Sequence, residues 1–133
     1  MSVTGTITVA AALIQDSSHN VLLVRKQGTD FFMQPGGKIE PKETPEEALI
    51  REQELGLIIS PAELVPMGIF TDLAANEAGH LLHAHMFKIN GCLDNIRPAA
   101  EIAEAIWINP DQAAHRVLAP LTKNQLLPLA WKD

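Results

Sequence analysis

The chain has 133 residues, a formal net charge of −6, 47% hydrophobic residues and one cysteine. This length predicts one domain spanning residues 1–133, and the acidic balance argues against nucleic-acid binding, which relies on basic side chains that neutralise phosphates. A lone cysteine excludes an internal disulfide, and no apolar run approaches the roughly 18–20 residues that cross a bilayer, so we expect a cytoplasmic protein without membrane contact.

The first third of the sequence predicts two strands and a sharp break. Thr4–Ile14 is rich in β-branched residues and predicts a strand. Val21–Arg25 predicts a second strand that pairs with the first across the turn residues 16–20. The short apolar run Phe31–Gln34 then ends at Pro-Gly-Gly 35–37, which is typical of a break in regular structure.

The clearest predicted element is a helix over Pro45–Leu55. Thr44 offers an N-cap hydroxyl, Pro45 suits the first helical position, and Glu47 can complete a capping box. Gly56 supplies a stop signal.

The second half predicts three more strands and two helical segments. The strands are Leu64–Thr71, His80–Ile89 and Ala105–Ile108. One helix opens at Asn109, and Thr122–Leu129 predicts another. Strands and helices in this order favour an α/β domain with a mixed β-sheet covered on both faces.

Acidic side chains gather directly after the glycine-rich turn. Six of the 16 acidic residues fall between residues 37 and 57: Glu40, Glu43, Glu46, Glu47, Glu52 and Glu54. A solvated helix face is one interpretation of this run. The other is a cation site, since an acidic chain that handles phosphate needs a divalent ion to screen the repulsion, and a glycine backbone lets a ligand approach closely.

The spacing in this segment resembles the signature of the Nudix (MutT-like) hydrolase family. Gly37 is followed after five residues by Glu43, and after seven more by Arg51-Glu52 and then Glu54-Leu-Gly-Leu57. The resemblance covers nearly the whole chain and implies a Nudix-type α/β/α sandwich with a mixed β-sheet. It also implies hydrolysis of nucleoside diphosphates linked to another moiety, with Mg²⁺ or Mn²⁺ as cofactor.

The resemblance also assigns roles to residues of the signature. The implied metal ligands are the Gly36 carbonyl and the glutamates Glu52 and Glu54, with Glu43 as an auxiliary ligand. Arg51 would pair with a carboxylate and hold it in place, so that Arg51, Glu52 and Glu54 form the catalytic set. A downstream carboxylate, Glu104 or alternatively Glu101, would complete the metal site or act as a general base.

The chain departs from the family pattern by two missing residues between Glu52 and Glu54. Gln53 then stands where a carboxylate belongs, and at about 100° per residue Glu52 and Glu54 point to nearly opposite sides of a helix. Either two residues are missing from the sequence, which we favour, or a turn after Glu52 returns Glu54 to the site, or the metal site is damaged. An alternative set of site residues is Glu43, Glu47, Arg51 and Glu54. Their spacings of four, four and three would place them along one face of a helix.

Four residues are candidates for substrate binding: Arg25, Gly37, Phe70 and Asn124. Arg25, with Lys26, ends the second strand near the expected cleft and could contact phosphate. Phe70 could stack on a base, although core packing is its ordinary role, and Asn124 could read a purine edge, although an exposed amide is the ordinary alternative.

The remaining chemically active side chains have plainer interpretations. His83 and His85 alternate along a predicted strand while His80 falls on its other face, which indicates sheet-surface histidines rather than a metal cluster. Cys92 has no activating neighbour and is interpreted as a small apolar residue.

The function implied is hydrolysis of a (deoxy)nucleoside triphosphate to its monophosphate and pyrophosphate, a nucleotide-pool housekeeping reaction. The alternatives are an ADP-sugar pyrophosphatase and a catalytically impaired nucleotide-binding module. The expected partner is a small nucleotide, and the expected assembly is a monomer or a homodimer.

Overall fold

The structure is a computed structural model that describes residues 5–51, 64–76, 78–89, 99 and 101–132. Its elements are, in chain order, β1 Gly5–Ile14, β2 Val21–Lys26, β3 Gly36–Lys38, α1 Pro45–Arg51, β4 Leu64–Leu73, β5 His80–Ile89, β6 Ile102–Ile108, α2 Pro110–Ala113, the π-helix η2 Thr122–Leu126, and α3 Leu127–Ala130. Among these helices, none is long and apolar enough to span a membrane.

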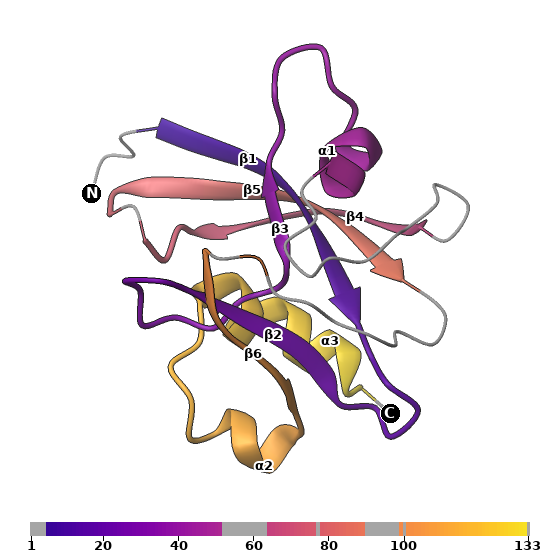
Figure 1. Ribbon diagram of the computed structural model, residues 1–133, viewed down its shortest axis with the longest axis vertical. Coiled ribbons are helices and arrows are strands. Elements are labelled where there is room, and N and C mark those ends of the chain that lie inside the picture. Colours follow the sequence, from indigo (N-terminus) through magenta and orange to yellow (C-terminus); the bar gives the residue numbers. More distant parts are fainter. Residues whose placement is uncertain (1–4, 52–63, 77, 90–98, 100, 133) are drawn as a thin grey trace.

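The main sheet has four strands in the order β3-β1-β5-β4 (Figure 1). β1 pairs in parallel with β5, whereas the β1–β3 and β4–β5 pairs are antiparallel. The sheet is therefore mixed, as the order of elements predicted. β2 and β6 form a separate antiparallel pair.

The predicted pairing of the second strand with the first is wrong. β3 and β5 occupy both edges of β1, so β2 meets β1 through the single bridge Gln15–Val21 and pairs instead with β6. The turn between them is held by the Asp16 carboxylate, which accepts the N–H groups of Ser18 and Asn20. All of Val21–Val24 is buried, which explains its unbroken apolar sequence.

The interpretation of Pro-Gly-Gly as a break in regular structure is also wrong, because Gly36–Lys38 forms β3. A Cβ atom at Gly36 would lie 2.2 Å from the carbonyl oxygen of Ala10 and 2.7 Å from the Cα of Ala11. Glycine is required here because the two strands approach so closely, and the Ala12 N–H donates to the Pro35 carbonyl at 2.9 Å on the same edge.

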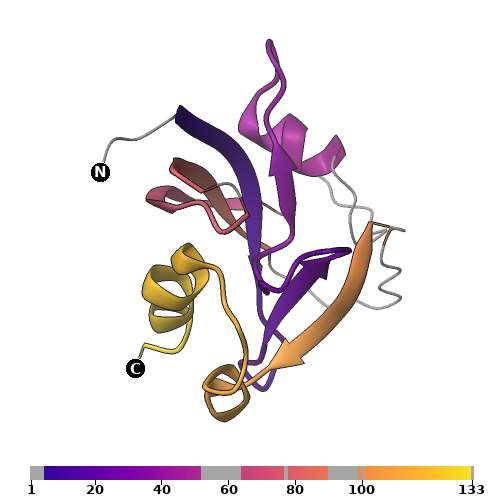
Figure 2. The ribbon, with the colours of Figure 1, turned by 90° about the vertical axis from the view of Figure 1, so that its left-hand side faces the viewer.

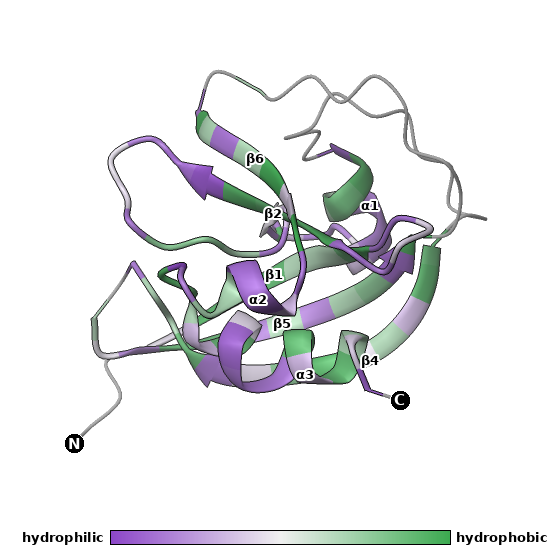
Figure 3. Cartoon of the chain, turned by 90° about the horizontal axis from the view of Figure 1, so that it is seen from below, coloured by the Kyte–Doolittle hydropathy of each residue, from purple (hydrophilic) through white to green (hydrophobic). Residues whose placement is uncertain are grey.

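Alternate residues of β1 face two hydrophobic clusters on opposite sides of the sheet. Ala10, Ala12 and Ile14 pack with Ala48 and Leu49 of α1. Ala11 and Leu13 pack in the second cluster, which contains residues of η2 and α3. Figure 2 shows α1 and the C-terminal helices on opposite sides of β1, and Figure 3 shows the apolar colouring of the strands between them. The predicted α/β/α sandwich is confirmed.

The helix starts follow the predicted capping chemistry. At α1 the Glu47 N–H donates to the Thr44 hydroxyl at 3.1 Å, while the Thr44 N–H donates to the Glu47 carboxylate at 2.8 Å. Asn109 caps α2 with an equivalent box. Residues 52–55 of the predicted first helix lie outside the described residues.

The predicted C-terminal helix exists, but its first part is a π-helix. The Leu127 N–H donates to the Thr122 carbonyl, five residues back, rather than to the carbonyl four residues back. Pro128 follows directly, and a proline ring clashes with the carbonyl four residues before it in a regular α-helix. The wider turn relieves this clash and places Thr122 at the inner side of the helix, where it is 1% exposed.

Candidate functional site

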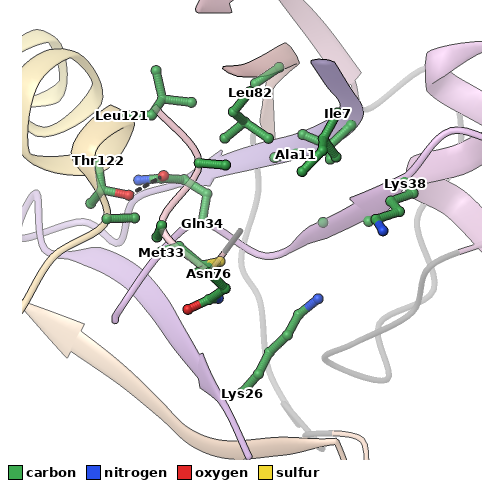
Figure 4. A pocket seen from close by; sticks show the side chains of 17 residues that line it. Ile7, Ala11, Lys26, Met33, Gln34, Lys38, Asn76, Leu82, Leu121 and Thr122 are labelled. Atoms are coloured by element: carbon green, nitrogen blue, oxygen red, sulfur yellow. Dashed lines mark hydrogen bonds between the residues drawn. The ribbon is translucent and has the colours of Figure 1, made fainter. Parts of the chain in front are cut away.

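A cavity of about 150 Å³ lies on the side of the sheet that η2 and α3 cover. Its apolar wall comes from alternate residues of β1 and β5, among them Ile7, Ala11 and Leu82, and from Leu121 before η2. Figure 4 shows these side chains along one side of the hollow. Such a wall fits a flat, largely apolar group.

Polar groups line the rest of the cavity. Lys26 at the end of β2, Lys38 at the end of β3 and Asn76 after β4 all contribute to its lining, as do Gly36 and Gly37. In Figure 4, Lys26 and Asn76 face the apolar wall from the opposite side. The cavity therefore combines an apolar interior with two cationic side chains, an arrangement suited to an organic group that carries a negative charge.

The floor of the cavity holds a hydrogen bond between two buried side chains. The Thr122 hydroxyl donates to Oε1 of Gln34 at 2.7 Å, and both residues line the cavity. Gln34 is 7% exposed, and its amide nitrogen is buried with no hydrogen-bond partner.

The signature residues Glu43 and Arg51 form an ion pair beside this cavity. Arg51 donates from Nε to Oε2 of Glu43 at 2.7 Å and from Nη2 to Oε1 at 2.9 Å. The Glu40 N–H also donates to Oε1 of Glu43, at 2.9 Å. Arg51 further donates to the carbonyl of Lys38 at 3.0 Å, so the pair fixes the strand that lines the cavity.

The charge of Glu43 is strongly favoured by this arrangement. The hydrogen bonds from Arg51, followed by the one from the Glu40 N–H, lower the pKa of the Glu43 carboxyl to about 2. Both of its oxygens already accept hydrogen bonds, so Glu43 in this conformation positions the loop and Arg51 rather than offering an unengaged ligand oxygen.

Arg25 and Glu104, two predicted site residues, lie opposite each other on β2 and β6. Arg25 donates to Oε1 of Glu104 from Nη2 at 2.7 Å and from Nε at 3.0 Å, and to the Thr29 carbonyl at 2.8 Å. Neither residue lines the described cavity. Glu101 is exposed at the start of this strand.

Phe70 and Asn124 also lie away from the cavity lining. Phe70 is half-buried on β4 and packs against the second cluster. Asn124 is exposed, and it donates to the Asp72 carboxylate at 3.4 Å. Burial raises the pKa of Asp72, but hydrogen bonds from Gln125 and from the Leu73 N–H outweigh it, so that the pKa falls below its ordinary value.

The metal ligands expected at Glu52 and Glu54, with the neighbouring Gln53, lie outside the described residues, as does Cys92. Among the residues that the structure describes, no three acidic, histidine or cysteine side chains gather closely enough to hold a metal ion. The described donors alone therefore do not make a divalent-cation site. The alternative set of residues along one helix face is not available as a metal site either. Its Glu47 caps α1, and its Glu43 binds Arg51.

The histidines of β5 alternate as expected from the sequence. In the parallel pairing with β1, His83 lies opposite Thr8 and His85 opposite Ala10, whose side chain packs on the α1 side. His80 and the cavity residue Leu82 are an odd number of positions from His83 and His85 along β5. They therefore lie on the other face of the strand. The three imidazoles thus do not share one face.

Sequence reasoning singled out Gly36, Gly37 and Lys26 among the cavity residues, but missed Gln34, Lys38, Asn76 and Thr122. The available signal was Gln34, a polar residue that ends an otherwise apolar run before Pro-Gly-Gly. Thr122 carried no signal, since it meets Gln34 across 88 positions of sequence.

Known proteins resemble this chain over nearly its full length. A family model described as the NUDIX domain matches residues 5–131. The CTP pyrophosphohydrolase of Escherichia coli (strain K12) is 29% identical over 119 residues, which cover 86% of this chain and 84% of that protein. The structure of a mutator MutT protein from Bacillus halodurans has a TM-score of 0.72 and 22% identity, with coverage of 96% and 84%.

A third similar structure belongs to a larger protein. A bifunctional NMN adenylyltransferase/ADP ribose pyrophosphatase from Francisella tularensis, complexed with AMP and a manganese ion, has a TM-score of 0.69 at 20% identity. The match covers 93% of this chain but 41% of that one. At these identities, both structural likenesses concern the fold.

Proposed function

Because this chain belongs to the NUDIX family and is a pyrophosphohydrolase of that family, we propose that it hydrolyses a nucleoside triphosphate to the monophosphate and pyrophosphate. The observation that carries the choice of a nucleotide is the cavity, whose apolar wall lies beside Gly36, Gly37 and two lysines. A relative named for CTP hydrolysis supports a triphosphate substrate. Such a housekeeping reaction belongs in the cytoplasm.

In this proposal the base enters the cavity and the phosphates leave it across β3. Lys26 and Lys38 would offset the phosphate charge, and the exposed edge of Gly36–Gly37 would let the chain approach the phosphate oxygens. Arg51 would act as a positioning residue, since it donates to both Glu43 and the Lys38 carbonyl. Hydrolysis adds water across one P–O–P link, so one phosphoryl group gains the hydroxyl and the other leaves with the bridging oxygen.

Nudix hydrolases generally use divalent cations, and we propose Mg²⁺, or Mn²⁺, for this chain. When bound, the ion would neutralise phosphate oxygens and lower the pKa of the attacking water. Glu52 and Glu54, with the Gly36 carbonyl, are the proposed ligands, and Glu43 and Glu104 are the proposed auxiliary carboxylates. Both auxiliary carboxylates are already held by an arginine, Glu43 by Arg51 and Glu104, through Oε1, by Arg25.

Two other functions compete with this proposal. An ADP-sugar pyrophosphatase is the enzymatic alternative, and the likeness to a structure that includes an ADP ribose pyrophosphatase favours keeping it. A nucleotide-binding module without turnover is the other, and the two-residue shortfall between Glu52 and Glu54 favours it.

Phosphate release separates the three functions. The chain is incubated with Mg²⁺ and each nucleoside triphosphate or ADP-sugar, with inorganic pyrophosphatase added for the triphosphates and alkaline phosphatase for the ADP-sugars. We expect turnover that depends on pyrophosphatase for at least one triphosphate. Turnover confined to ADP-sugars would favour the enzymatic alternative, and nucleotide binding without any turnover would favour the binding module.

A further inference from the structure

The cavity contains a polar pair that its apolar wall does not explain. Among the described residues, the buried polar side chains are Gln34 and Thr122, and these two bind each other. They are 88 positions apart in sequence, Gln34 two residues before β3 and Thr122 at the start of η2. Both line the cavity (Figure 4).

The pair leaves one group unsatisfied. Oε1 of Gln34 accepts the Thr122 hydroxyl, whereas Nε2 has no partner although it is buried. A buried donor without an acceptor destabilises the fold. An acceptor carried by a ligand in the cavity would satisfy it.

We infer that Gln34 determines which base enters the cavity, by donating from Nε2 to a ring carbonyl oxygen of the substrate. The inference rests on the proposed function, since it takes the occupant to be a nucleotide base. The hydroxyl of Thr122 donates to Oε1 and so fixes which way the amide is turned, with the donor Nε2 as the end that has no partner. Thr122 is thus a positioning residue for Gln34.

The chemistry favours bases that carry a keto oxygen. Guanine, cytosine and uracil each project a carbonyl oxygen from the ring, whereas adenine carries an exocyclic amino group and no carbonyl. An amide fixed as a donor would pair with the carbonyl oxygen of the first three, whereas adenine offers it ring nitrogens as its only acceptors. The last torsion of a glutamine is soft, so a small rotation of the whole amide can adjust Nε2 toward an acceptor in the cavity.

The test compares three variants by their selectivity. Gln34→Met keeps the length of the side chain and removes the amide, and Thr122→Val keeps Gln34 but releases its carbonyl. Gln27→Met makes the same change at an exposed position outside the cavity lining. For each protein, kcat/KM is measured for GTP, CTP, UTP and ATP with Mg²⁺, and the ligand-free melting temperature is recorded.

In the wild type and in Gln27→Met we expect at least one keto-bearing nucleotide to be preferred over ATP. Gln34→Met should lower kcat/KM for that nucleotide by about tenfold, the loss of one hydrogen bond, and leave ATP within about threefold. Thr122→Val should raise kcat/KM for ATP relative to the keto-bearing nucleotide, because the freed amide can then accept. The ligand-free melting temperature serves as a check of folding, because Gln34→Met removes the unpaired Nε2 and also leaves the buried Thr122 hydroxyl without its acceptor.

The inference is decided by the selectivity ratio, which is kcat/KM for the preferred keto-bearing nucleotide divided by kcat/KM for ATP. A wild type without preference over ATP, or a ratio that Gln34→Met leaves unchanged, would overturn it. If Gln34→Met does not fold, the ratio in Thr122→Val decides in the same way. If the wild type binds nucleotides but turns none over, the proposed function fails, and the same ratios measured as Kd by calorimetry decide the inference separately.

Discussion

At the scale of single residues, the Glu43 carboxylate connects the acidic segment to the cavity. Its pKa of about 2, held down by the hydrogen bonds from Arg51, means that folding favours its charged form. A group whose pKa is depressed in the folded state contributes stability above its unfolded pKa, here about 4.5, and loses that contribution as the pH falls toward 2.

We therefore predict that Glu43→Gln makes the free energy of unfolding depend less on pH in the acid range. The free energy of unfolding of the wild type should exceed that of Glu43→Gln at pH 6, and the gap should shrink steadily between pH 4.5 and 2. Urea denaturation at pH 6, 4 and 3 measures the gap. Glu101→Gln, the same change at an exposed position, is the matched control, and a gap that does not vary with pH would contradict the assignment.

Gly36 makes a second residue-scale prediction. A methyl group at this position would meet the Ala10 carbonyl oxygen at 2.2 Å, which is backbone and cannot yield as a side-chain end can. Gly36→Ala should lower the free energy of unfolding by at least about 2 kcal/mol, at the upper end of the cost of overpacking.

The control for this change lies on the adjacent strand. A Cβ atom at Gly5 would meet only the His80 ring, at 3.3 Å, which can move aside. Gly5→Ala should therefore cost much less than Gly36→Ala in the same urea titration. Equal losses in the two variants would mean that the contact between β3 and β1 is not the cause.

At the scale of elements, the start of α1 depends on its N-terminal box. Thr44 and Glu47 satisfy each other's backbone N–H groups. Thr44→Ala should lower the free energy of unfolding by about 1 kcal/mol, whereas Thr44→Ser, which keeps the hydroxyl, should cost much less. Because α1 carries Arg51, Thr44→Ala should also reduce turnover more than Thr44→Ser in the phosphate-release assay.

The sequence allowed most elements to be predicted, for local reasons. Caps at Thr44 and Asn109 and apolar periodicity act within a few residues, so the helices and strands they mark were found in place. β3 was missed because its glycines are required by a neighbouring strand rather than by a turn. The partner of β2 was wrong because pairing depends on which strand occupies each edge of β1.

At the scale of the whole molecule, chain length itself is testable. The signature lacks two residues between Glu52 and Glu54, and these side chains cannot converge on one ion from a regular helix. We predict that protein whose intact mass matches 133 residues turns over its triphosphate only weakly. Mass spectrometry on the same sample used for phosphate release is the measurement, and robust turnover at that mass would refute the geometric argument.

The candidate site could be predicted only where its residues are close in sequence. Glu43 and Arg51 lie eight positions apart and meet across one helix, so their spacing identified both. Gln34 and Thr122 meet only after the whole domain is folded, and no local pattern marks such a contact. Arg25 was predicted to contact phosphate, and Glu104 was predicted to serve the metal site. In the structure the two side chains bind each other, because β2 and β6 pair.

The parallel pairing of β1 with β5 sets an order of events during synthesis. Gly5 lies opposite His80 and Ile14 opposite Ile89, so the inner strand of the sheet waits for its partner until most of the chain has left the ribosome. Contacts this distant along the chain slow folding and leave apolar strands open in the meantime. A nascent chain halted before residue 80 would hold β1 beside β3 alone, with one edge of β1 open to other chains.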